Sequence, residues 1–157
     1  MWTVSVAVLG LAAGSCLLWT LHRRYAVVDV RGASMEPTLR HGDRVLVRRI
    51  RHGRVRTGDI VVIERFAPDD QPDEQPDERA RRVWVVKRAA AVAGDPVPGS
   101  VARAAGVAPG TAVPAGRVVV LGDNPAHSTD SRVWGYLPTD RLLGVVRRRM
   151  GAGDRAG

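Results

Sequence analysis

A run of uncharged residues at the start of the chain, residues 2–21, constrains the fold more than any other feature. As an α-helix it would extend for about 30 Å, which matches the hydrocarbon core of a bilayer. Trp2 and Trp19 stand near its two ends, as in the aromatic belts of membrane helices, and the basic residues 22–24 follow it. A cleavable signal peptide is the alternative, but the positive n-region is missing and the apolar core is longer than such a peptide needs. The sequence therefore predicts a transmembrane anchor over residues 1–24.

The rest of the chain has the pattern of short β-strands. Six valine-rich runs are separated by Gly, Pro, Asp and Asn: residues 26–31, 43–50, 59–65, 82–92, 117–121 and 141–149. Val45 and Val47, and likewise Val61 and Ile63, alternate with other residues, as in strands with one wet face. No stretch after the anchor reads as a long amphipathic helix. We therefore predict a mainly antiparallel β domain over residues 25–150, followed by a flexible tail, residues 151–157.

Two segments between the predicted strands read as loops. Residues 68–79 are acidic and proline-rich, and they contain the unit Gln-Pro-Asp-Glu twice in tandem. A calcium site there is disfavoured, because the segment has no glycine for the sharp turn of an EF-hand loop. Residues 94–116 contain four prolines and are also predicted to form a loop.

The use of basic residues is unusual. Lysine and arginine together number 24, yet Lys87 is the only lysine. Arginine keeps its proton in proteins, whereas burial can remove the proton of a lysine. Lys87 lies in the apolar run 82–90, where its pKa would fall. Lys87 is either a functional base or a lysine left by chance on a solvated strand of an arginine-rich chain. Composition alone does not separate these two interpretations.

A possible nucleophile for such a base lies in the turn-forming run 32–39. Pro37 fixes its own φ, and Gly32 permits a positive φ, so the run can hold the Ser34 hydroxyl and backbone N–H in place. A neutral lysine beside Ser34 could take the hydroxyl proton, as in serine–lysine catalysis. The simpler alternative is a serine that makes only local hydrogen bonds in a turn.

Composition excludes several other classes of function. The formal net charge of +8 suits an acidic partner such as anionic lipid headgroups, but aromatic residues make up only 4% and no basic helix is present, which disfavours nucleic acid. Cys16 is the single cysteine, so no intrachain disulfide can form. The four histidines lack metal-ligand spacing, and His127 beside Ser128 is a weak candidate for a serine–histidine pair. We expect neither a metal nor a cofactor.

Four sequence boxes in order resemble those of type I signal peptidases, the serine–lysine leader peptidase family of S26 type. The boxes are Ser-Met-Glu-Pro-Thr-Leu at 34–39 with Gly-Asp-Arg-Val-Leu-Val at 42–47, Lys-Arg at 87–88 with Gly-Asp at 94–95, Gly-Asp-Asn at 122–124, and Ser-Thr-Asp-Ser-Arg at 128–132 with Trp-Gly-Tyr-Leu-Pro at 134–138. The resemblance covers residues 30–149. It implies the antiparallel β fold that signal peptidases share with the SOS-repressor autoproteases.

The resemblance also implies roles for individual residues. Ser34 would be the nucleophile and Lys87 the general base, with the Ser34 N–H as one oxyanion donor. Some family members carry a hydroxyl two residues before the nucleophile, where this chain has Gly32, so a side-chain donor is absent there. The supporting roles fall on Ser128, which would hydrogen-bond the lysine, and on two ion pairs, Asp123 with Arg88 and Asp130 with Arg132. The second pair is also reasonable from the residues alone, since positions i and i+2 share one side of an extended chain.

The resemblance also implies a location for the domain, a preference at the cleaved bond of the substrate, and a role for residues 94–116. Arg23 and Arg24 would place the following domain in the cytoplasm by the positive-inside rule, whereas the family places it on the extracytoplasmic side of the bacterial cell membrane. We follow the family, because signal peptides are cut there. The family prefers small side chains at the first and third positions before the cleaved bond. Residues 94–116 would be a reduced form of its variable second subdomain.

Three functions are consistent with these observations. The leading one is a membrane-bound endopeptidase that removes signal peptides from exported preproteins, with the secretion machinery as a further partner. The second is a dedicated maturation protease for one or a few co-expressed precursors. The third is a non-enzymatic, arginine-rich binding module next to the membrane.

Overall fold

The computed structural model describes residues 22–50, 55–66 and 82–152. Residues 1–21 of the predicted anchor, the acidic segment 68–79 and residues 153–157 of the predicted tail lie outside the described residues. In the part of the chain that is described, no helix is long and apolar enough to cross a membrane. The structure therefore bears on the domain that follows the predicted anchor.

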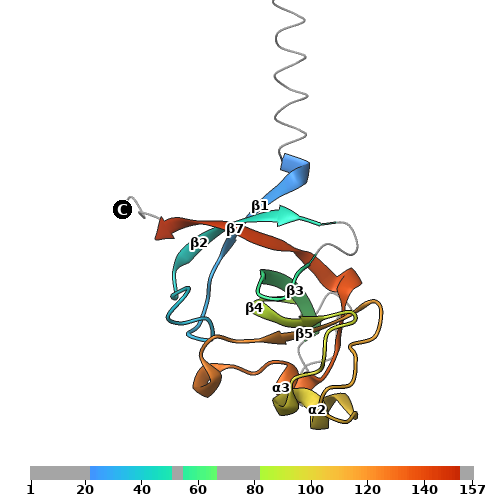
Figure 1. Ribbon diagram of the computed structural model, residues 1–157. Helices are drawn as coiled ribbons and strands as arrows, with labels where there is room; N and C mark the ends of the chain where they lie inside the picture. The colour runs from blue at the N-terminus through green and yellow to red at the C-terminus, as the bar shows by residue number, and fades with distance from the viewer. Residues whose placement is uncertain (1–21, 51–54, 67–81, 153–157) are drawn as a thin grey trace, which may run out of the picture.

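Seven antiparallel strands form one curled sheet (Figure 1). They are β1 (Tyr25–Asp29), β2 (Asp43–Arg49), β3 (Ile60–Phe66), β4 (Arg82–Val92), β5 (Arg117–Leu121), β6 (Leu137–Pro138) and β7 (Leu142–Ala152). The order across the sheet is β1-β2-β7-β3-β4-β5-β6. The predicted mainly antiparallel β domain is confirmed, and each of the six valine-rich runs coincides with one of the longer strands. Only β6 was missed, because two residues are too few to show a pattern.

The central strand β3 is buried on both of its faces, which corrects the expectation of one wet face. Val61, Val62 and Ile63 are each 0% exposed. Val61 and Ile63 belong to a core cluster with residues of β4, β5 and β7, whereas Val62 belongs to a second cluster on the other face. That second cluster includes Met35 and Leu39 from the loop between β1 and β2. The loop that carries Ser34 is thus part of the core.

Residues 94–116 are more ordered than the predicted loop. They contain the helix α2 (Gly99–Ala105) and an isolated bridge between Pro96 and Ala112. Val101 and Ala102 of the helix are buried in a third core cluster against β4 and β5. Gly106 ends the helix in the left-handed region with φ 68°. The four prolines around this short helix hide its periodicity in the sequence.

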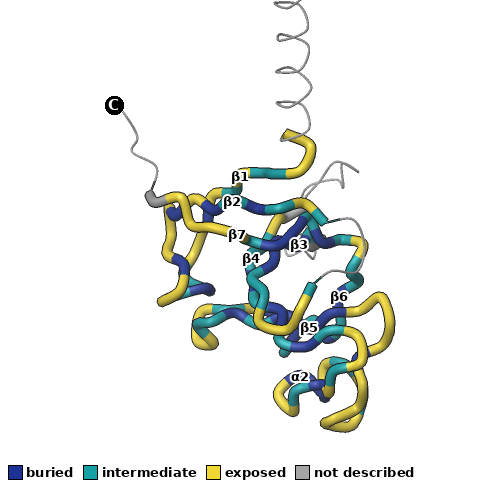
Figure 2. Tube along the Cα trace, turned by 45° about the horizontal axis from the view of Figure 1, so that its top comes forward, coloured by how far each residue is buried: buried dark blue, intermediate teal, exposed yellow. Residues whose placement is uncertain are grey.

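Three further short helical elements lie near the end of the chain: α3 (Ser131–Trp134) and the 3-10 turns Pro125–His127 and Thr139–Arg141. Burial follows the sheet, while many residues of the connecting loops and part of α2 are exposed (Figure 2). The elements α2 and α3 both lie at the end of the sheet away from residues 22–24 (Figure 1).

We expect Met35→Ala to lower stability by about 3 kcal/mol, because Met35 is 1% exposed and its removal leaves a cavity beneath the Ser34 loop. Thermal unfolding should show a drop of roughly 10 °C in midpoint for a chain of this size. Met150→Ala is the matched control, since Met150 is 52% exposed. Equal midpoints for the two variants would show that the loop is not held by its packing.

Candidate active site

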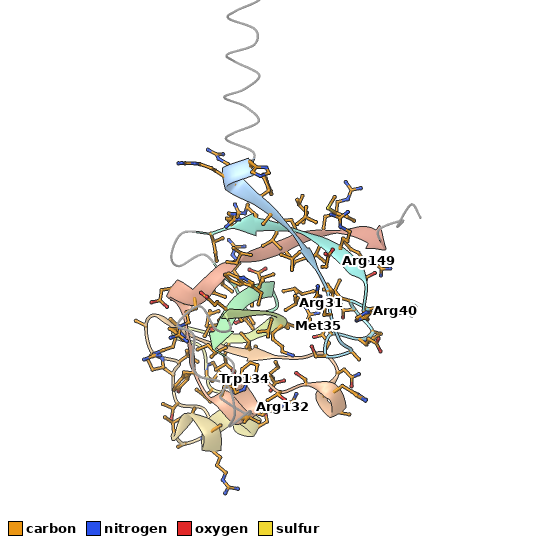
Figure 3. All side chains as sticks on the ribbon, turned by 180° about the vertical axis from the view of Figure 1, so that it is seen from behind. Arg31, Met35, Arg40, Arg132, Trp134 and Arg149 are labelled. Atoms are coloured by element: carbon orange, nitrogen blue, oxygen red, sulfur yellow. The ribbon has the colours of Figure 1, made fainter. Side chains whose placement is uncertain are left out.

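Ser34 is held by a loop whose two ends are hydrogen-bonded to each other. The Val30 N–H donates to the Asp43 carbonyl at 2.8 Å, and the Gly42 N–H donates to the Val30 carbonyl at 2.9 Å. Within the loop, the Leu39 N–H donates to the Met35 carbonyl at 2.9 Å. Figure 3 shows Met35, the residue that follows Ser34, in the interior of the molecule. The nucleophile candidate is therefore fixed by core packing and backbone bonds together.

Gly32 uses the conformational freedom that the sequence indicated. Its φ is +81°, a region that residues with a side chain rarely adopt. The Gly32 N–H donates to His41 Nδ1 at 3.1 Å, so this N–H is already engaged. The Ser34 N–H makes no hydrogen bond to any described residue and is the better oxyanion donor of the two.

Lys87 is a buried lysine on β4. It is only 4% exposed, and its backbone pairs with Val61 of β3. Burial lowers the pKa of Lys87 below its usual value, the negative charge of Asp130 opposes this shift, and the positive charge of Arg132 adds to it. The lone lysine of the chain is thus placed where its pKa falls, as the sequence predicted.

Lys87 is connected to a chain of polar groups. Its Nζ donates to Ser128 Oγ at 3.0 Å, and Ser128 Oγ donates to Asp130 Oδ2 at 2.7 Å. Because the single hydroxyl proton of Ser128 goes to Asp130, Ser128 can only accept a hydrogen bond from Lys87. A neutral Lys87 would then keep its lone pair for another partner.

Asp130 is the fixed end of this chain. It is 0% exposed and accepts bonds from Arg132 Nη2 at 2.6 Å and from the Gly122 N–H at 2.9 Å. Burial alone would raise the pKa of Asp130, but the hydrogen bonds from Arg132, Gly122 and Ser128 lower it to about 2. The predicted pair of Asp130 and Arg132 is present, although its geometry is not that of an extended chain. Asp130 is the N-cap of α3, and Arg132 lies in the first turn of that helix.

Gly122 brings the Ser34 loop and Ser128 together. A methyl group at Gly122 would lie 2.2 Å from Ser128 Oγ and 2.6 Å from the Ser34 carbonyl oxygen. The Asn124 N–H also donates to that carbonyl at 3.0 Å. Sequence reasoning assigned no role to Gly122, and the only signal was its place in the Gly-Asp-Asn box.

The second predicted ion pair is also present. Arg88 Nη2 lies 2.6 Å from Asp123 Oδ2, and Arg88 Nε donates to Asp123 Oδ1 at 2.8 Å. The same guanidinium donates to the Gly58 carbonyl at 2.8 Å. The hydrogen bond from Arg88 lowers the pKa of Asp123. The pair joins β4 to the segment that follows β5, on the strand position next to Lys87.

Ser34 and Lys87 line one cavity of about 540 Å³, which lies between β1, the Ser34 loop and β4. Among the described residues no hydrogen bond joins these two side chains; catalytic contacts of this kind often tighten only when substrate is bound. Among the described residues, strand β1 pairs only with β2, and β4 pairs with β5 only from Arg88 onward. Two unpaired strand edges therefore border the cavity that holds Ser34 and Lys87.

The alternative sites have weaker support. His127 is exposed, and its ring nitrogen lies 3.4 Å from Asn124 Oδ1. Within residues 22–50, 55–66 and 82–152 no group of three His, Cys, Asp or Glu side chains could hold a metal ion. The chemistry of the site is that of a buried amine, two hydroxyls and a carboxylate.

Two comparisons with known proteins show what the chain is similar to. The model of the family described as signal peptidase, peptidase S26, matches residues 2–101 and 98–150. The chain is also similar to the probable signal peptidase I-1 of Synechocystis sp. (strain ATCC 27184 / PCC 6803 / Kazusa). The two are 31% identical over an alignment of 162 positions, which covers 90% of this chain and 80% of the relative.

We expect Gly122→Ala to disrupt the site, because the added methyl group would collide with Ser128 and with the Ser34 backbone. Overpacking of this kind costs roughly 1–3 kcal/mol, and relief would push Ser34 away from Ser128. Gly99→Ala is the matched control, since nothing lies within 4 Å of a methyl group there. Thermal unfolding and hydrogen–deuterium exchange of residues 30–42 would detect the change; identical exchange in both variants would contradict it.

Asp130 should make stability depend on pH in the acid range. Its pKa in the folded chain is about 2 against an ordinary 3.8, so the unfolded state binds the proton more readily. The stabilisation is complete above about pH 4 and is lost as the pH falls towards 2. In urea unfolding, the difference between wild type and Asp130→Asn should therefore shrink over this window, while the exposed Asp140→Asn control follows wild type. A constant difference between wild type and Asp130→Asn would refute the assignment.

Proposed function

Because the chain belongs to the signal peptidase family, peptidase S26, we propose that it is a membrane-anchored serine endopeptidase that cleaves signal peptides from exported preproteins through Ser34 and Lys87. The observation that carries the proposal is the placement of the only lysine. Lys87 is buried, its pKa is lowered by that burial, and it lines the same cavity as Ser34.

The reaction would begin with proton transfer from Ser34 to neutral Lys87. Ser34 Oγ attacks the carbonyl carbon of the cleaved bond, and the Ser34 N–H donates to the oxyanion that forms. The Lys87 ammonium then gives its proton to the departing amine. Water, deprotonated by Lys87, attacks the acyl–serine ester, and the Lys87 ammonium returns that proton to Ser34 Oγ as the ester bond breaks. Catalysis at neutral pH needs a lysine whose pKa is lowered, and the burial of Lys87 lowers it.

Ser128 and Asp130 would act as positioning residues. Ser128 accepts one bond from Lys87 and donates its own proton to Asp130, so the amine is oriented without a competing donor. Asp130 is held in turn by Arg132 and by Gly122. This arrangement leaves the lysine lone pair available for the Ser34 hydroxyl, which reaches it once the substrate has closed the cavity.

The two unpaired strand edges would bind the substrate as an added strand. An extended peptide can pair with the free edges of β1 and of residues 82–87 of β4 through its backbone groups. Its alternate side chains then point to the same side, so the first and third residues before the cleaved bond face the cavity walls together. Val28 and Val86 contribute to those walls, which fits the small side chains that the family prefers at both positions.

The proposed location is the extracytoplasmic side of the bacterial membrane, with residues 1–24 as a single-pass anchor. The uncharged run at residues 2–21 supports the anchor, and the substrate class supports the side. The secretion machinery that delivers preproteins would be the natural neighbour of the enzyme.

The dyad is tested with the purified full chain and a preprotein, followed by N-terminal sequencing of the product. Ser34→Ala and Lys87→Arg should each lower kcat/KM by roughly a thousand-fold or more, because the nucleophile or the deprotonable base is lost. Ser100→Ala is the matched control, since Ser100 is an exposed serine of α2. Unchanged processing by Ser34→Ala or Lys87→Arg would defeat the mechanism.

The pH profile gives a second readout. Only neutral Lys87 is active, so kcat/KM should rise with pH through an apparent pKa below the ordinary lysine value of 10.5. An inflection at the ordinary value would show that burial does not tune this amine.

A further inference from the structure

A second cavity, of about 960 Å³, lies beside residues 22–24 and apart from Ser34 and Lys87. Four arginines line it: Arg23, Arg24, Arg49 and Arg141. Two acids, Glu64 and Asp140, also line it. Whichever ion pairs form among these side chains, the lining keeps an excess of two positive charges. Such an excess around one concave site favours an anion.

The position of this cavity relates it to the membrane. Residues 22–24 form the helical turn that precedes β1, and they follow directly after the uncharged residues 2–21. Figure 1 shows this turn in blue at one end of the curled sheet, on the side where β2 ends and opposite α2 and α3. With the proposed anchor over residues 1–24, on which this inference rests, the arginine-lined cavity would lie at the level of the headgroups.

The non-arginine part of the lining suits the same location. Trp84 is 45% exposed and borders this cavity as well as the one that holds Ser34. Partly buried indole rings favour the boundary between headgroups and hydrocarbon. Leu142 and Leu143 provide apolar surface next to the arginines. The cavity thus joins guanidinium groups to apolar walls, as the polar and apolar parts of a phospholipid require.

We propose that this cavity binds the phosphate group of an anionic phospholipid in the membrane that holds the anchor. Guanidinium groups bind phosphate oxygens in a bidentate manner, and the glycerol and first methylenes of the lipid contact Trp84 and the leucines. The substrate itself does not fit this site, because the positively charged start of a signal peptide would be repelled by the arginines.

The test uses the full chain carrying Ser34→Ala, so that its outcome does not depend on proteolysis. The protein in mixed micelles is titrated with phosphatidylglycerol or phosphatidylcholine, and native mass spectrometry counts the lipid that stays bound. Phosphatidylglycerol should bind preferentially. The double variant Arg24→Gln/Arg49→Gln should weaken its binding by roughly thirty-fold, since each arginine near an anionic surface contributes about 1 kcal/mol.

Matched controls separate a site from general charge. Arg103→Gln/Arg117→Gln removes the same charge from exposed positions on α2 and β5 and should change binding by less than about three-fold. Arg24→Lys/Arg49→Lys should retain most of the binding, and thermal unfolding checks that each variant is folded. Equal losses in the two glutamine variants, or equal binding of the two lipids, would overturn the proposal. Displacement of the lipid by inorganic phosphate at the same concentration would also overturn it, because the ligand would then be a soluble anion.

Discussion

The burial of one amine organises the site. Lys87 is buried on β4, where a charged side chain is expensive unless its charge is removed or paired. The structure offers it a hydroxyl rather than a carboxylate as direct partner, and it holds the carboxylate of Asp130 one step further away. A direct carboxylate would stabilise the ammonium and raise the pKa of the lysine. The intervening Ser128 therefore orients the amine without fixing its charge.

This arrangement depends on elements far apart in the sequence. The Ser34 loop is packed into the core through Met35 and Leu39, β4 presents Lys87, and the segment from Gly122 to Arg132 supplies the polar chain. Gly122 is the point at which they meet, since no side chain fits between the Ser34 carbonyl and Ser128. The ion pair of Arg88 and Asp123 also joins β4, at the position next to Lys87, to the segment that follows β5. Small shifts in any one of these segments would separate Ser34 from Lys87, the proposed nucleophile and base.

Much of the fold was predictable because valine-rich runs and turn residues are local signals, and the site was predicted from the lone lysine together with the resemblance to a family. The predicted family is confirmed, the strand runs match, and both expected ion pairs are present. The rest was hidden for physical reasons. Burial of both faces of β3 depends on a loop folding back over Val62, which no local pattern records. The helix α2 is too short to show a period, and the role of Gly122 arises only from the approach of two distant segments.

The unpaired edge of β1 has a consequence for the protein in the absence of substrate. An open strand edge next to a groove can pair with a second copy of the chain as readily as with a peptide, and this is a route to aggregation. Strand β1 is only five residues long and ends at Asp29, whose carboxylate is ion-paired to Arg44 at 3.3 Å, with the exposed Arg31 just beyond. Charges at the end of a short edge strand disfavour long, flat pairing between identical chains. The cavity beside β1 can thus remain open for one extended peptide. The short length and the charges of β1 disfavour edge-to-edge pairing of two copies of the chain.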